Sequence, residues 1–153
     1  MAALKGKRKE YLTVKDLQKV LDSCKLHLNQ IDEVWPNVYI GNVAVAQNKN
    51  ALLKLADDST HFDLDVYFQP AADFIHKGLK SPDGKVLVHC IMGMSRSSTL
   101  VLAYLMIYHH LELKQALQKV IQKRAIYPNR NFLALLLDLD LQLTRKKKTC
   151  QIL

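Results

Sequence analysis

The chain has 153 residues, a length that suits one domain with a modest hydrophobic core. Its composition is 49% hydrophobic and 24% charged, which excludes an intrinsically disordered chain, and no apolar run approaches the roughly 20 residues of a membrane-spanning helix. The net charge of +8 predicts anionic partners such as phosphate groups, nucleic acid or acidic lipid, although a basic soluble protein without a specific partner would carry the same charge. The basic first ten residues run into a charged amphipathic stretch, which is not the pattern of a secretory signal.

The first half of the chain is expected to contain both helices and strands. Apolar residues at helical spacing predict a helix over residues 13–24, and residues 33–41 predict a strand, a turn at Pro36-Asn37 and a second strand. A short helix is expected over residues 45–55 and an acidic loop over residues 56–63. Residues 64–79 carry an apolar stripe typical of an amphipathic helix, with Asp63 as its N-cap.

The second half of the chain begins with a short, apolar, β-branched run at residues 85–89, which is typical of a buried parallel strand. Residues 97–108 are apolar nearly all round, so we expect a buried helix there. An amphipathic helix over 114–124 and a leucine-rich helix over 129–143 follow. This order predicts an α/β fold, with a parallel or mixed sheet of few strands flanked by helices.

The three cysteines, Cys24, Cys90 and Cys150, are odd in number and far apart, which argues against a disulfide framework. They favour a reducing compartment, so we expect a cytoplasmic protein that could also enter the nucleus. None of the six histidines is spaced with them as a zinc ligand set, and we expect no metal and no cofactor. We expect Trp35 in the core and His109-His110 at a helix end, where a cation is favoured.

A loop between the strand at 85–89 and the helix at 97–108 has the composition of an anion site. A strand that leads through a loop into a helix can point several backbone N–H groups inward, and the helix N-terminus adds partial positive charge. Gly93 allows a tight turn, and the Arg96 guanidinium matches two phosphate oxygens. Cys90, at the start of this loop, should have a pKa well below the free value of about 8.5. A thiolate there can attack a bound phosphate and form a phosphocysteine. A lone cysteine after a strand is more often a buried, inert thiol, so the prediction depends on the whole pattern rather than on Cys90 alone.

The run HCIMGMSRS resembles the signature of cysteine-dependent protein tyrosine phosphatases: His-Cys, five residues, then Arg-Ser. Together with STLVLAYLM, Ala56-Asp57-Asp58 and Tyr127-Pro128-Asn129, it resembles the small atypical dual-specificity phosphatases related to the vaccinia phosphatase, over about residues 32–143. The resemblance implies a catalytic domain over 29–144, between a basic, partly helical extension (1–28) and a basic tail (145–153). It implies Cys90 as the nucleophile, Ser97 as the hydroxyl that stabilises the departing thiolate, and His89 as a residue that orients the loop. It also implies a phosphate site made by His89, Ile91, Met92, Gly93, Met94, Ser95 and Arg96.

A general acid is also needed, because an alkoxide leaves poorly unless it is protonated. The resemblance places this acid on the loop that holds Asp57 and Asp58, and we choose Asp58; both carboxylates could instead cap or solvate the loop. Asn129 has two alternatives: it supports the phosphate loop from behind, or it caps the last helix.

The sequence departs from the family between Leu55 and Ala56. Members normally carry two further strands before the acid loop, whereas here the expected helix runs straight into that loop. We therefore expect a chain that lacks an internal segment, in which the strand at 85–89 pairs only with residues 33–41 and leaves one edge exposed. Such a domain should be weakly stable.

The basic run 145–148 is followed closely by Cys150, the fourth residue counted back from Leu153. That pattern is typical of prenylation, and neighbouring basic residues would supply the second membrane signal. Membrane association is expected only if Cys150 is modified; the alternative is a disordered, soluble basic tail.

The leading functional hypothesis is a dual-specificity protein phosphatase that hydrolyses phosphotyrosine and phosphoserine or phosphothreonine. Its expected partners are phosphorylated proteins, with signalling kinases suggested by the resemblance; no nucleic-acid partner is expected, and a homodimer is allowed. The first alternative is a catalytically weak or inactive phosphoprotein-binding module, because the core strands are missing. The second is a phosphatase for small molecules or RNA 5′-phosphates on the same scaffold.

Overall fold

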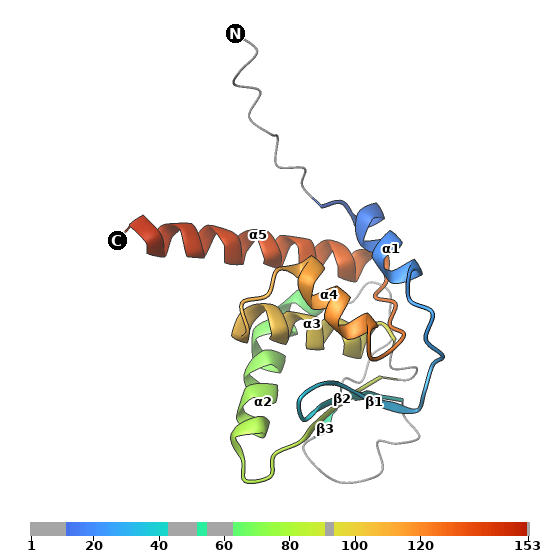
Figure 1. Cartoon of the computed structure of the whole chain (residues 1–153). Helices are drawn as coiled ribbons and strands as arrows, with labels where there is room; N and C mark the ends of the chain where they lie inside the picture. Colours follow the sequence, from blue (N-terminus) through green and yellow to red (C-terminus); the bar gives the residue numbers. More distant parts are fainter. Residues whose placement is uncertain (1–11, 43–51, 55–62, 91–93, 153) are drawn as a thin grey trace.

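The computed structural model describes residues 12–42, 52–54, 63–90 and 94–152, and it has an α/β architecture, as predicted (Figure 1). Its elements are α1 (Val14–Asp22), β1 (Ile31–Trp35), β2 (Val38–Gly41), β3 (Leu52–Lys54), the 3₁₀ helix η2 (Leu64–Tyr67), α2 (Phe68–Lys80), β4 (Val86–His89), α3 (Arg96–Tyr108), α4 (Leu113–Ile121) and α5 (Arg130–Ile152). Figure 1 shows α2, α3 and α4 on one side of the sheet and α5 running across them. Among the described residues, no helix combines the length and the apolar character needed to cross a membrane.

The sheet has four strands in the order β1-β2-β4-β3. β1 and β2 form the predicted antiparallel hairpin, whose turn includes Asn37 at a φ of 64°. β4 lies between β2 and β3 and is parallel to both. All four residues of β4 are buried, as expected for a central parallel strand.

The prediction that β4 would have a neighbour on one side only is wrong. Residues Leu52, Leu53 and Lys54 were expected in a helix, but they form β3 and pair with Leu87, Val88 and His89. The physical reason is the open edge of β4, whose N–H and C=O groups need partners. Pairing with a neighbouring strand satisfies these groups, and this outweighs the local helix propensity of Leu and Lys. The rest of the predicted helix, residues 45–51 and 55, lies outside the described residues.

Two helix boundaries also differ from the prediction. The segment after Asp63 begins as the 3₁₀ turn η2 and becomes α2 only at Phe68, and the Asp63 side chain makes no capping hydrogen bond. The last helix does not end near residue 143 but continues to Ile152, so the basic segment 145–152 is helical rather than a disordered tail.

The first helix, α1, begins with a reciprocal capping box. The Thr13 hydroxyl accepts a hydrogen bond from the Asp16 N–H at 3.2 Å, and the Asp16 carboxylate accepts one from the Thr13 N–H at 2.9 Å. Leu17 and Leu21 are buried, and α1 packs against α4 and α5.

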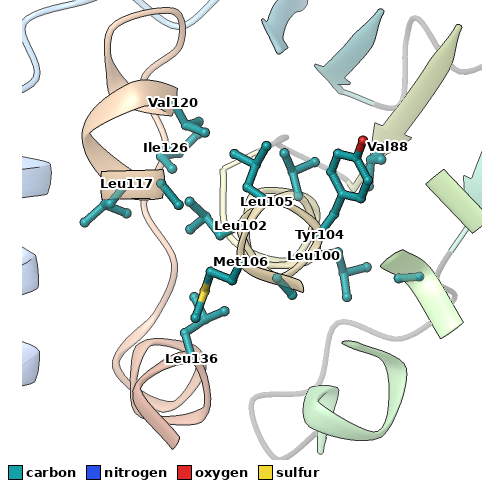
Figure 2. Packing of buried hydrophobic residues seen from close by; sticks show 14 of the residues in the cluster. Val88, Leu100, Leu102, Tyr104, Leu105, Met106, Leu117, Val120, Ile126 and Leu136 are labelled. Atoms are coloured by element: carbon teal, nitrogen blue, oxygen red, sulfur yellow. The ribbon is translucent and has the colours of Figure 1, made fainter. Parts of the chain in front are cut away.

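Helix α3 is the centre of the core, as its uniformly apolar sequence predicts. Every residue from Arg96 to Met106 is buried. Figure 2 shows side chains of α3 packed against α4, α5 and the segment between them; the labelled residues include Leu102, Leu105, Met106, Leu117, Val120, Ile126 and Leu136. Burying one such side chain contributes about 1.5–3 kcal/mol, so this packing fixes the helix that follows the predicted phosphate loop.

The aromatic residues around the end of α3 correct one expectation about charge. Trp35 packs on the core, with its ring centroid 4.8 Å from that of His109, and His109 Nε2 lies 2.9 Å from the Tyr104 hydroxyl oxygen. Burial, and then the nearby His76 and His110, hold the pKa of His109 below its ordinary value. His109 does end the helix, but the lowered pKa disfavours the cation that we expected there.

A buried ion pair ties the segment after α4 to β1. Arg124 is fully buried, and its Nη1 donates to an Asp32 carboxylate oxygen at 2.8 Å and to the Asn29 carbonyl oxygen at 2.7 Å. Removing one partner of a buried pair leaves an uncompensated charge in the interior.

We therefore expect Arg124→Ala to lower the free energy of unfolding by about 3–5 kcal/mol. Urea denaturation followed by circular dichroism would measure this loss. The matched control is Lys123→Ala, an exposed neighbour, which should change the stability by less than about 0.5 kcal/mol. A similar small change for both variants would contradict the structural role of Arg124.

Candidate active site

The predicted nucleophile lies at the carboxyl edge of the sheet. β4 ends at His89, which is paired in register with Gly41 of β2 and Lys54 of β3. Cys90 follows directly and is partly buried, and His89 is 7% exposed. Ligands of α/β proteins bind beyond the carboxyl ends of parallel strands, so the sequence brings Cys90 to the edge where a substrate is expected.

The first turn of α3 brings two predicted residues to this edge. Arg96 and Ser97 open the helix and are 5% and 1% exposed. The Cys90 Sγ and Ser97 Oγ atoms lie 3.2 Å apart, within hydrogen-bonding distance. A hydroxyl at this distance can donate to a thiolate and stabilise its negative charge. The N-terminus of α3 adds partial positive charge at the same place.

The carbonyl groups at the end of the predicted phosphate loop are held by α3 and by the segment before α5. The Met94 carbonyl oxygen accepts hydrogen bonds from the Ser98 hydroxyl and from the Tyr127 N–H, the latter at 2.7 Å. The Ser95 carbonyl oxygen accepts from the hydroxyls of Ser98 at 2.9 Å and Thr99 at 2.6 Å. The sequence interpretation assigned no role to Ser98 or Thr99. The available signal was a pair of hydroxyls, in an otherwise apolar helix, placed to reach carbonyls three and four residues earlier.

Asn129 combines the two alternatives considered for it. Its side-chain oxygen accepts a hydrogen bond from the Phe132 N–H at 2.9 Å, which makes it the cap of α5. Its backbone N–H donates to the Ser95 hydroxyl oxygen at 3.1 Å, which supports the loop from behind. With the described part of the loop, residues 94 and 95, the hydrogen bond of Asn129 therefore comes from its main chain.

Several predicted site residues lie outside the described part of the chain: Asp57, Asp58, Ile91, Met92 and Gly93. The same holds for the side chain of Cys150, although its backbone belongs to α5. Within the described ranges, no three His, Cys, Asp or Glu side chains come together in a way that could hold a metal ion.

A parallel strand that ends in His-Cys, followed by an Arg-Ser pair at the start of a buried helix, defines a cysteine-dependent phosphatase. The chain belongs to the dual-specificity phosphatases, because the model of the dual specificity phosphatase catalytic domain matches residues 9–142. It is an enzyme that removes phosphate from tyrosine and from serine or threonine in proteins, and the comparisons do not favour an inactive binding module.

Named relatives support this assignment. The chain is 43% identical to human dual specificity protein phosphatase 26 over 164 residues, which cover 87% of this chain and 78% of that protein. It is 40% identical to human dual specificity protein phosphatase 13B over 152 residues, covering 78% and 77% of the two chains. The first alignment is longer than the whole chain of 153 residues, so the relative has residues within the aligned region that this chain lacks.

Solved structures share the fold. The crystal structure of human DUSP28 matches with a TM-score of 0.64 and 21% identity, covering 77% of this chain and 97% of that one. The crystal structure of DUSP15 matches with a TM-score of 0.62 and 24% identity, covering 78% and 95%. At these identities the likeness extends to the fold alone.

Proposed function

We propose that the chain dephosphorylates proteins through a phosphocysteine on Cys90. In the first step the thiolate attacks phosphorus, the bond from phosphorus to the ester oxygen breaks, and Asp58 gives its proton to that oxygen. In the second step water attacks phosphorus and loses a proton to Asp58, and the P–S bond breaks with its electron pair returning to sulfur. Arg96 and the N–H groups of residues 91–96 hold the phosphoryl oxygens.

The observation that carries this proposal is the distance of 3.2 Å between Cys90 Sγ and Ser97 Oγ at the N-terminus of a buried helix. The sulfur leaves more readily when the negative charge that develops on it is stabilised, and the Ser97 hydroxyl is placed to donate to the sulfur as the P–S bond breaks. The buried Arg96 beside it supplies a permanent positive charge at the same edge.

We expect Ser97→Ala to slow the second step more than the first, by roughly 10- to 100-fold, because a hydrogen bond to a charged group is lost. Rapid mixing with p-nitrophenyl phosphate should show a burst of one equivalent of p-nitrophenol, followed by a slow steady state. The matched control is Ser23→Ala, which removes an exposed hydroxyl that donates to the Val20 carbonyl at the end of α1 and should show no burst. An equal slowing of both steps in Ser97→Ala would contradict the proposed role.

Within phosphorylated proteins, signalling kinases carrying phosphate on threonine and tyrosine are the substrate class that the family resemblance supports. The absent internal segment is proposed to lie between Leu55 and Ala56, immediately before the Asp57-Asp58 pair in the sequence. A cytoplasmic or nuclear location, a homodimer and lipid attachment at Cys150 stay predictions from the sequence.

A further inference from the structure

Two buried hydroxyl side chains on α3 bind the main chain of the phosphate loop. Ser98 and Thr99 are both 0% exposed. The Ser98 hydroxyl donates to the carbonyl oxygens of Met94 and Ser95, and the Thr99 hydroxyl donates to that of Ser95. Serine and threonine in helices often bond to a carbonyl one turn earlier, and buried hydroxyls need a partner. In this case, however, the acceptors belong to the last residues of the loop that follows Cys90.

The Met94 carbonyl lies before the first residue of α3. Besides the Ser98 hydroxyl, it accepts the Tyr127 N–H, which comes from the segment between α4 and α5. The Ser95 carbonyl accepts the Thr99 N–H at 3.0 Å in addition to the two hydroxyls. Each of these two peptide groups is therefore held by several donors that lie behind the loop.

The orientation of these carbonyls decides the orientation of the N–H groups. Across a planar trans peptide unit, the C=O and the following N–H point in opposite directions. Since the Met94 and Ser95 carbonyls face α3, the N–H groups of Ser95 and Arg96 face away from the helix body. The Cys90 sulfur lies at that end of the helix, as its distance of 3.2 Å from the Ser97 hydroxyl shows.

We propose that Ser98 and Thr99 are positioning residues: by holding the Met94 and Ser95 carbonyls, their hydroxyls aim the Ser95 and Arg96 N–H groups at the phosphoryl oxygens and at the Cys90 thiolate. The inference rests on the proposed function, in which Cys90 is the nucleophile. Its consequence is that removing either hydroxyl weakens anion binding and thiolate stabilisation, although neither side chain touches the substrate.

The test compares Thr99→Val, which keeps the shape and loses the hydroxyl, with Thr99→Ser, which keeps the hydroxyl. Ser98→Ala removes the second hydroxyl. If one of the two hydroxyl-free variants does not fold, the other still tests the inference. Two properties are measured in a background where Cys24 and Cys150 are replaced by serine. The first is the rate of Cys90 alkylation by iodoacetamide as a function of pH, and the second is the protection of Cys90 by inorganic phosphate. Neither measurement requires catalytic turnover.

We expect Thr99→Val and Ser98→Ala to raise the apparent pKa of Cys90, to weaken phosphate protection about tenfold and to lower kcat/KM about tenfold. Thr99→Ser, which keeps the hydroxyl, should match the wild type in the apparent pKa of Cys90, in phosphate protection and in kcat/KM. Tyr104→Phe, which removes a buried hydroxyl farther along α3, is the control for loss of stability alone, and its alkylation profile should match the wild type.

Unchanged alkylation and phosphate protection in the two hydroxyl-free variants would overturn the inference, as would equal impairment of Thr99→Ser and Thr99→Val. Failure of the proposed function would look different, because Cys90→Ser would then retain activity or the wild type would show no thiolate of low pKa.

Discussion

Replacing Cys90 by serine is expected to lower kcat for p-nitrophenyl phosphate by more than about 10⁴-fold, because a serine hydroxyl at neutral pH is a far weaker nucleophile than a thiolate. The measurement is steady-state release of p-nitrophenol, together with thermal unfolding to show that the variant is folded. The sulfur and the oxygen differ little in size, so the structure around the partly buried position should be kept.

The matched control is Cys24→Ser, which changes the same two atoms at a different place. The Cys24 thiol donates to the Ile121 carbonyl oxygen at 3.4 Å and thus links the end of α1 to α4. We expect this variant to keep its activity. Substantial hydrolysis by Cys90→Ser, or an equal loss in both cysteine variants, would contradict the assignment of the nucleophile.

Replacing Asp58 by alanine is expected to lower turnover of phosphotyrosine peptides roughly 10²–10⁴-fold, because the tyrosine oxygen would leave without a proton. The loss should be much smaller for p-nitrophenyl phosphate, since p-nitrophenolate leaves readily as an anion. The ratio of the two losses therefore reports on the acid itself and not on general damage to the site.

Asp57→Ala is the matched control, because the two carboxylates are adjacent in the sequence. If Asp57→Ala lowers turnover of phosphotyrosine peptides much more than that of p-nitrophenyl phosphate, and Asp58→Ala does not, the assignment of Asp58 as the general acid is wrong. A folded Asp58→Ala enzyme should still bind phosphorylated substrates but hydrolyse them slowly, so it can be used to trap them. The phosphoproteins that it retains from a cell extract would test the proposed kinase substrates.

The elements that could be predicted are those whose burial is evident from a short stretch of their own sequence. The uniformly apolar run of α3 and the β-branched run of β4 specify a buried helix and a buried strand without reference to any partner. β3 could not be predicted in this way, because Leu52, Leu53 and Lys54 have no pattern of their own that favours a strand. Their conformation comes from the open edge of β4, more than thirty residues later in the chain.

The residues of the site likewise fall into those that the sequence could predict and those that it could not. Cys90, Arg96 and Ser97 could be predicted because they lie close together in the sequence, around one loop. The supports of that loop are harder to predict, because the Tyr127 N–H and the Asn129 N–H act through the main chain, which carries no side-chain signal. Backbone donors of this kind become visible only when the path of the chain is known.

The hydrogen bond from the Tyr127 N–H to the Met94 carbonyl has a consequence for protein synthesis. On the ribosome, β4 emerges long before Tyr127, and the buried partners of α3 on α5, among them Leu133 and Leu136, emerge later still. A nascent chain that ends before Tyr127 would contain Cys90 but neither the N–H that holds the Met94 carbonyl nor α5, which packs against α3. We therefore expect phosphatase activity only after α5 has been synthesised, and translation products that keep Cys90 but lack Tyr127 and α5 should be inactive.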